Sequence, residues 1–307
     1  MTNTLPKIIV VLGTTASGKT DLGLELAKEF NGEIINADSR QVYKEMDIGT
    51  AKPAGQYCNN EYLVDGIPHH LMDICTPDDE FTVADFKGRA HATIVDIVAR
   101  GKLPIIVGGT GLYISTLVDN WDIPKVAPDK YLRSELENNT LDELVEMLRK
   151  ADPETAKTID LKNPRRVLRA LEVALDSGES FVKQRTKSAP LYDALQIGID
   201  IPREILYERI NKRVDEQLAD GLLEETKKLS EKYSWELPSM SGIGYKQMGY
   251  YLRGEMTLPE AVDFLKRDTR HYAKRQMTWF KRDQRINWVL GEKIVLDTEK
   301  LVKQFVK

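Results

Sequence analysis

The sequence contains little cysteine. Cys58 and Cys75 are the only two in 307 residues, and they form no CxxC pair. No histidine or cysteine near either of them has the spacing of a zinc-ligand set. The sequence therefore argues against a disulfide framework and against a structural zinc site. We expect a protein of the reducing cytoplasm.

Long apolar runs and an excess of one charge are also missing. The longest apolar run near the N-terminus, Ile8 to Leu12, is far shorter than the ~18 residues of a membrane span, and no later segment approaches that length. The 44 Lys+Arg and 48 Asp+Glu leave a net charge of only -4. We expect a soluble protein without an obvious export signal or membrane association. Nucleic-acid binding would need a local basic patch.

Strand-like and helix-like segments alternate in the first part of the chain. The apolar segments Lys7–Leu12, Glu33–Asn36 and Leu103–Val107 have the length of buried strands. Between them lie segments of helical periodicity, such as the one that carries Phe86, Ala90, Ile94 and Ile97. This alternation predicts an α/β fold in which a mostly parallel sheet is covered by helices on both faces.

The pattern changes between residues 114 and 194. Two helical segments, Asp142–Lys150 and Arg165–Asp176, follow one another there without a convincing strand. At roughly 150 residues per domain, 307 residues correspond to about two domains. We therefore expect a helical insertion domain, 114–194, within a core formed by 1–113 and 195–307, whose C-terminal region is helical.

A glycine-rich loop follows the first strand. Its eight residues fit the pattern GxxxxGK[ST], in which backbone N–H groups surround an anion, the lysine neutralises it and the hydroxyl holds Mg²⁺. The alternative is a turn that only joins strand to helix, but the position between a predicted strand and helix favours a P-loop NTPase-like core. The predicted diphosphate-binding residues are Gly13, Thr14, Thr15, Ala16, Ser17, Gly18, Lys19 and Thr20, with Thr20 as the metal ligand.

The carboxylate that usually accompanies such a loop is not obvious. Asp38, after Glu33–Asn36, and Asp200, in the segment 196–200, are candidates, and neither is a clean match. Ligands of parallel sheets bind beyond the carboxyl ends of the strands, which favours Asp38 as a base or metal partner. Its structural alternative is a helix N-cap. The loop alone leaves open whether its phosphates belong to a nucleotide or to another diphosphate.

Six segments together resemble one family, the bacterial tRNA dimethylallyltransferases, or IPP transferases. They are Gly13–Thr20, Asn36–Tyr43, Asp47–Pro53, Pro68–Asp73, Gly108–Tyr113 and Tyr272–Phe280. The resemblance runs from the P-loop nearly to the C-terminus. One departure is Thr14, where the family usually has proline. Because that side chain is not among the fixed anion-binding groups, we expect the same reaction.

The resemblance implies transfer of a dimethylallyl group from its diphosphate to the exocyclic N6 amine of adenosine 37 in the anticodon stem-loop of tRNA. The P-loop, with Lys19, Thr20 and Mg²⁺, would then hold the departing diphosphate. Asp38 matches the family's general base, and the adenine must leave its stack to be reached. We expect a monomer. Whether ATP binds the P-loop stays open.

Arg213 is a second candidate cation. It lies seven residues after Leu206, about 20° away on a helical wheel, so it borders the apolar face of its predicted helix. A charge there needs a partner. An ion pair with a neighbouring carboxylate is one explanation. The other, implied by the resemblance, is a clamp on the diphosphate.

A basic helical face is the sequence's own signal for RNA. Residues 246–288 contain ten Lys/Arg and five Asp/Glu. On one predicted helix, Pro259–Arg285, the side chains of Arg267, Arg270, Lys274, Lys281 and Arg285 fall within about 60° of arc. A solvated face is the alternative. The acids lie mostly off this arc, and like charges at such spacing cost stability unless a polyanion meets them.

The resemblance adds further residues that meet tRNA. They are Asp38, Ser39, Arg40, Gln41, Thr110, Arg133, Arg165, Arg166, Val167, Leu168, Arg169, Ser241, Gly242, Ile243, Gly244, Tyr245 and Lys246, beside Arg270, Lys274 and Lys281 of the basic face. His69 and His70 have no further ligands at metal spacing, so we expect packing and hydrogen bonding there. A small-molecule P-loop kinase and a non-catalytic RNA-binding NTPase remain as alternatives, together with relatives that prenylate free adenine nucleotides.

Overall fold

The computed structural model describes residues 4–124, 126, 129–291 and 294–307. The chain divides into two compact units. One runs up to Val118 and resumes at Leu191, and the other is Asp119–Pro190. The division differs from the expected one because α3 (Gly111–Val118) packs its last residues into the first unit's core, and Tyr192 returns to that core before the next strand.

The first unit is built on an eight-stranded sheet with the order β3-β4-β5-β2-β6-β1-β7-β8. Its strands are β1 (Lys7–Gly13), β2 (Gly32–Asn36), β3 (Gln56–Cys58), β4 (Glu61–Val64), β5 (Ile67–His70), β6 (Leu103–Gly108), β7 (Asp193–Ile199) and β8 (Asn287–Val289). From β5 to β8 all pairs are parallel. The predicted α/β class with a mostly parallel sheet is confirmed.

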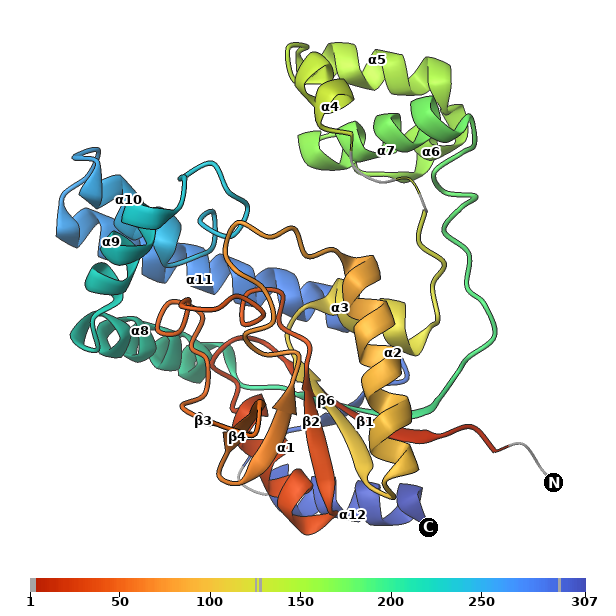
Figure 1. The fold of residues 1–307 in the computed structure, drawn as a ribbon, viewed down its shortest axis with the longest axis vertical. Helices are drawn as coiled ribbons and strands as arrows, with labels where there is room; N and C mark the ends of the chain where they lie inside the picture. The colour runs from red at the N-terminus through yellow and green to blue at the C-terminus, as the bar shows by residue number, and fades with distance from the viewer. Residues whose placement is uncertain (1–3, 125, 127–128, 292–293) are drawn as a thin grey trace. The chain divides into compact units, whose positions relative to one another are not determined.

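Helices cover both faces of this sheet (Figure 1). On one face, α1 (Lys19–Glu29) and α12 (Ile294–Val306) pack Leu22, Leu26 and Val302 against the strands. On the other face, α2 (Val83–Ala99), α3 and α11 (Leu258–Phe280) contribute Phe86, Ile114 and Phe280. The central strands are buried on both faces, which explains their continuous apolar runs.

A second cluster of helices lies beside the sheet within the same unit. It contains α8 (Arg203–Ala219), α9 (Leu222–Lys232), α10 (Tyr245–Leu252) and the first half of α11. The loop after β2 packs Val42 and Met46 into this cluster. The segment that follows Asp38 is thereby fixed between the sheet and the helices.

The predicted long helix ends earlier than expected. It was predicted to reach Arg285, but α11 ends at Phe280 and Lys281 is its C-cap. The Asp283 carboxylate accepts hydrogen bonds from the backbone and side chain of Arg285, and the chain then enters β8, which pairs with β7. Arg285 therefore does not belong to the helical face.

The second unit is helical and has its own core. It consists of α4 (Lys130–Leu136), α5 (Leu141–Ala151), α6 (Pro153–Thr158) and α7 (Pro164–Ser177). Leu148, Val167 and Leu171 are fully buried in its interior. Among the residues described in both units, no helix has the length and apolar composition needed to cross a membrane.

Candidate active site

Three neighbouring strands end at the same edge of the sheet, and each is followed by residues of the site. β1 leads into the P-loop, β2 leads to Asp38, and β6 leads to Gly109 and Thr110. The register places Leu12 beside Gly108 and Asn36 beside Val107. The three loops are therefore adjacent, as expected for ligand-binding loops of a parallel sheet.

The P-loop has the backbone of an anion-binding turn. Ala16 and Gly18 have φ values of 61° and 88°, in the left-handed region. A Cβ on Gly13 would lie 2.7 Å from the Ser17 hydroxyl oxygen, so the turn needs glycine there. The Ser17 hydroxyl is buried and has no hydrogen-bond partner in the described residues. A buried polar group costs free energy unless it is paired, and an anion oxygen bound at this loop could accept the hydrogen bond of this hydroxyl.

Lys19 lies near two other predicted residues, Asp38 and Arg213. Its side chain is half-buried, and its ammonium donates a hydrogen bond to the Thr14 carbonyl oxygen at 3.1 Å. Burial lowers the pKa of Lys19 to about 8, while nearby Asp38 raises it and nearby Arg213 lowers it further. The structure therefore brings together Lys19, Asp38 and Arg213, which are far apart in the sequence.

Arg213 reaches the site from α8. Its guanidinium is largely buried, and burial lowers its pKa, with Asp21 and Glu216 opposing the shift. Within the part of the chain that the structure describes, no carboxylate lies at ion-pair distance from Arg213 and no acceptor takes a hydrogen bond from it. The ion pair that was the alternative explanation for this arginine is therefore not formed among the described residues. Lys19 and Arg213 come near each other, and neither forms an ion pair with a described carboxylate.

Asp38 is held by a turn rather than by a helix. Its Oδ1 accepts a hydrogen bond from the Arg40 backbone N–H at 2.8 Å. The Asn36 side chain accepts from the Asp38 N–H and donates to the Asp38 and Leu71 carbonyl oxygens. No helix begins here, so the N-cap interpretation is wrong. The second carboxylate oxygen accepts no hydrogen bond from any described residue, which leaves it available to a proton donor.

Three residues with hydroxyl groups, Thr110, Tyr113 and Tyr272, lie near Asp38. The Thr110 hydroxyl accepts from the Ser39 N–H at 3.0 Å and is hydrogen-bonded to Tyr272 of α11. Burial raises the pKa of Tyr272, and Asp38 raises it further. Burial also raises the pKa of Tyr113, with Asp38 among the additional causes. Both tyrosines therefore stay neutral at ordinary pH.

Gln276 is a site residue that the sequence analysis did not single out. Its Oε1 accepts from the Thr15 backbone N–H, and its Nε2 donates to the Gly109 carbonyl oxygen, both at 2.9 Å. A Cβ on Gly109 would lie 2.3 Å from that nitrogen. Gln276 thus joins the P-loop to the loop after β6. Its position on the apolar face of a predicted helix was the available signal, because a buried amide needs partners.

The predicted RNA segments near the site are partly engaged within the protein. Arg40 donates to the Pro238 carbonyl oxygen at 2.6 Å, and Gln41 donates to the carbonyl oxygens of Thr50 and Ala51. The prediction that the Tyr245 side chain meets tRNA does not fit the structure. Its ring is fully buried, and its hydroxyl donates a hydrogen bond to Glu225 at 2.6 Å. From the turn at 241–246, the exposed Lys246 is better placed to meet a partner.

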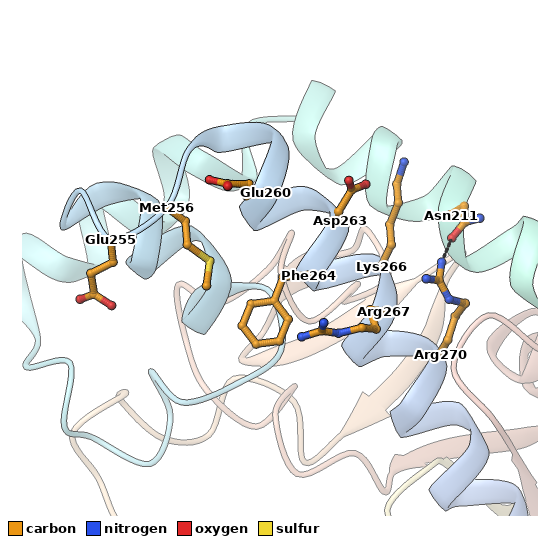
Figure 2. Close-up of a pocket in the computed structure, with 9 residues that line it drawn as sticks. All are labelled: Asn211, Glu255, Met256, Glu260, Asp263, Phe264, Lys266, Arg267 and Arg270. Atoms are coloured by element: carbon orange, nitrogen blue, oxygen red, sulfur yellow. Dashed lines mark hydrogen bonds between the residues drawn. The ribbon is translucent and has the colours of Figure 1, made fainter.

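The face of α11 is less uniformly basic than the wheel predicted. Arg270 is half-buried and donates to the Asn211 side chain at 2.7 Å (Figure 2). Arg270 lines an open groove of about 870 Å³, and two acidic residues, Glu260 and Asp263, line that groove as well. Lys281 lies 3.5 Å from Asp200. Lys274 is exposed and has no partner among the described residues.

In the second unit, the predicted RNA residues divide into buried and exposed ones. Val167 and Leu168 pack into the core, so their side chains do not reach a partner. Arg133 and Arg169 both bind the carboxylate of Glu172, which is 1% exposed. Arg165 and Arg166, at the start of α7, are exposed.

A magnesium ion would be bound at the P-loop jointly by the protein and by phosphate oxygens. No group of three His, Cys, Asp or Glu side chains that could hold a metal occurs in the described residues. Mg²⁺ usually keeps several waters and is bound by one or two protein groups together with phosphate oxygens. The Thr20 hydroxyl, at the start of α1, is suited to that arrangement. The histidines do not contribute, since His70 pairs with Glu33 and His69 with the Ile67 carbonyl.

The low pKa of Lys19 predicts how diphosphate binding depends on pH. Lys19 is charged below about pH 8 and loses its proton above it, while a bound anion favours the charged form. We expect the affinity for inorganic diphosphate, measured by calorimetry relative to that of a Lys19→Arg variant, to be constant below pH 7.5. Above pH 8 it should fall by up to about tenfold per pH unit.

Lys19→Arg is the matched control, because arginine keeps its charge throughout this range. It corrects for the titration of diphosphate itself. Equal pH profiles of the two proteins would show that Lys19 is not the group that titrates.

Comparison with known proteins identifies what this arrangement is similar to. Residues 41–283 match the family model described as IPP transferase, and residues 6–66 match the model described as isopentenyl transferase. The chain is 45% identical to the tRNA dimethylallyltransferase of Acetivibrio thermocellus, over 97% of this chain and 96% of the relative. It is 46% identical to that of Staphylococcus haemolyticus, over 95% and 89%.

Solved structures give the same result. The full-length tRNA isopentenylpyrophosphate transferase from Bacillus halodurans is 39% identical, with a TM-score of 0.72 over 97% of this chain and 96% of that one. A eukaryotic dimethylallyltransferase acting on tRNA is 31% identical, with a TM-score of 0.77 over 93% of this chain and 74% of that one. The similarity covers both units and every loop of the site.

Proposed function

The chain belongs to the IPP transferase family, and from this premise we propose that it is a tRNA dimethylallyltransferase. It transfers a dimethylallyl group from dimethylallyl diphosphate to the N6 amine of adenosine 37 in tRNA and releases diphosphate. The observation that carries this proposal is the meeting of Lys19 and Arg213 near Asp38, because these two half-buried cations form no ion pair with any described carboxylate. A diphosphate and a proton donor together complete this site.

The P-loop side of the site stabilises the leaving group. As the bond between the donor carbon and the diphosphate oxygen breaks, negative charge gathers on the diphosphate. Lys19 and Arg213 supply two positive charges, and the loop amides and the Ser17 hydroxyl supply hydrogen bonds. Mg²⁺ held by Thr20 would neutralise part of the same charge when bound.

The β2 side of the site serves the nucleophile. The adenine N6 amine is weakly nucleophilic and must lose one proton as its new bond to carbon forms. The oxygen of Asp38 that accepts no hydrogen bond takes that proton. Thr110, which is hydrogen-bonded to the Ser39 N–H and to Tyr272, holds the segment next to Asp38 in place. Since diphosphate leaves with its electron pair and no water takes part, no residue for aligning a hydrolytic water is needed.

The tRNA contacts are proposed from the exposed members of the predicted set. In the first unit these are Lys246, Lys274 and Lys281, and in the second unit Arg165 and Arg166. The half-buried Ser39, which follows Asp38, is proposed together with them. Arg133 and Arg169 share one carboxylate, that of Glu172, so the three side chains together keep a net positive charge that can attract tRNA. We also propose that the protein acts as a monomer in the cytoplasm, where its RNA substrate is found.

A transfer reaction tests this function against its alternatives. The protein is incubated with labelled dimethylallyl diphosphate and unmodified tRNA, and separately with labelled ATP. We expect label in the tRNA and no ATP turnover. ATP turnover without any transfer would favour a small-molecule kinase or an RNA-binding NTPase instead.

The exposed cations of α11 and its C-cap give a prediction for RNA affinity. Replacing Lys274 and Lys281 by Gln removes two charges without touching the buried face of the helix. We expect the slope of log K for tRNA against log salt to become less steep by roughly 0.7–0.9 per lost phosphate contact, and diphosphate binding to stay unchanged. The matched control replaces Lys300 and Lys303 of α12, on the opposite face of the sheet. Equal slopes for both double variants would show that the α11 cations are only solvated.

A further inference from the structure

Arg185 is a half-buried cation in the second unit. It lies in the segment after α7, and its guanidinium carbon is 5.5 Å from the centre of the Trp121 ring and 5.6 Å from that of Phe181. Phe181 itself belongs to the core of this unit. The two rings fix the arginine against the core instead of leaving it free in solvent, so its charge is held in place.

No described carboxylate of the protein pairs with this charge. Within the part of the chain that the structure describes, the Arg185 guanidinium forms no ion pair and donates no hydrogen bond. The neighbouring cations are different, since Lys183 pairs with Glu154 and Lys187 with Asp119. Burial lowers the pKa of Arg185, and the nearby Arg166 lowers it further. A desolvated charge beside a like charge is unfavourable unless another partner arrives.

The chemistry of the missing partner follows from the shape of the guanidinium. Aromatic rings contact its flat faces, whereas its five N–H donors point outward in its plane and match two oxygens of one phosphate. The surroundings favour an anion as well. Residues 157–187 contain eight Lys/Arg and four Asp/Glu, although the whole chain has a net charge of -4.

We propose that Arg185, together with Arg166, forms a binding subsite for a backbone phosphate of the RNA substrate, with Trp121 and Phe181 as its support. This inference rests on the proposed function, because tRNA is the polyanion which that function brings to the protein. The subsite lies entirely within the second unit and takes no part in the chemical step. Its role is to add one oriented phosphate contact to RNA binding.

The test compares two neighbouring charge removals, Arg185→Gln and Lys183→Gln. The affinity of the full-length protein for unmodified tRNA is measured over a salt series. We expect Arg185→Gln to lower the affinity and to make the slope of log K against log salt less steep by roughly 0.7–0.9. Lys183→Gln should leave both unchanged. Binding of inorganic diphosphate should be unaffected in both variants.

Two further variants keep the test decisive. Arg185→Lys keeps the charge but loses the planar fork, so it should keep the salt slope and lose part of the affinity. If Arg185→Gln unfolds, the exposed Arg166 replaces it in the comparison, and Arg166→Gln should reduce the slope by the same amount. An unchanged slope in a folded variant, or an equal change in Lys183→Gln, overturns the subsite.

The outcomes also separate this inference from the proposed function. If the unmodified protein binds tRNA in an Arg185-dependent manner but transfers no dimethylallyl group, the subsite stands and the function fails. If the protein transfers the group and Arg185→Gln binds tRNA normally, the function stands and the subsite fails.

Discussion

Asp38→Asn should reduce the single-turnover rate of dimethylallyl transfer by roughly 10²–10⁴-fold, the usual contribution of a general base. The amide has the same size as the carboxylate and can still accept from the Arg40 N–H through its oxygen, so the turn after β2 is preserved. The other carboxylate oxygen becomes an NH₂ group, which cannot take a proton from the adenine amine. Binding of tRNA and of the donor should remain close to normal.

Asp200→Asn is the matched control for this variant. Asp200 follows β7 and was the second carboxylate that the sequence offered, but it lies 3.5 Å from Lys281. We expect near-normal transfer from it. Fast single-turnover transfer by Asp38→Asn would remove Asp38 from the role of base, and loss of transfer in Asp200→Asn alone would assign that role to Asp200.

Lys19→Ala should weaken donor binding and slow the departure of diphosphate. Removing one preorganised donor from a developing negative charge typically costs about 10²–10³ in rate, and Lys19 carries a full charge as well. Arg213 and the loop amides remain, so a residual rate is expected. Single-turnover kinetics at saturating tRNA, with the donor concentration varied, separates the loss of donor binding from the loss of rate.

Lys28→Ala serves as the control on the same helix. Lys28 lies in the last turn of α1 and pairs with Asp65 at 3.2 Å, away from the P-loop. It should behave like the unchanged protein. If Lys19→Ala lost tRNA affinity while it kept donor affinity, the two substrates would have been assigned to the wrong sides of the site.

The central sheet and the P-loop could be predicted because their signals are local. β1, β2 and β6 are continuous apolar runs, and the glycine pattern specifies the turn that follows β1. The antiparallel strands β3 and β4 were not predicted. They are only three and four residues long, β3 is exposed and β4 is only partly buried, so that the Asn59-Asn60 and Asp65-Gly66 turns are their clearest signal.

Interactions between distant segments explain the remaining differences. Arg213 was found from one helical wheel because its own helix shows that it borders the apolar side. The same reasoning overestimated the basic face of α11, because a helical wheel does not show that the helix ends at Phe280. Nor does it show that Asn211 lies close to Arg270 and Asp200 close to Lys281.

Gln276 and Arg185 show a second limit of the sequence. A buried glutamine and a half-buried arginine have no distinctive local pattern. Their importance depends on what lies opposite them: Thr15 and Gly109 for Gln276, and two aromatic rings for Arg185. Only the folded chain brings these groups together.

The position of the transferred group tests the central claim most directly. After reaction with labelled dimethylallyl diphosphate, the tRNA is digested to nucleosides, and a matched tRNA that carries guanosine in place of adenosine 37 is treated in parallel. We predict that all label is found as N6-dimethylallyladenosine from the first tRNA and none in the second. Equal labelling of both tRNAs, or label in free adenine nucleotides instead of tRNA, would contradict the account.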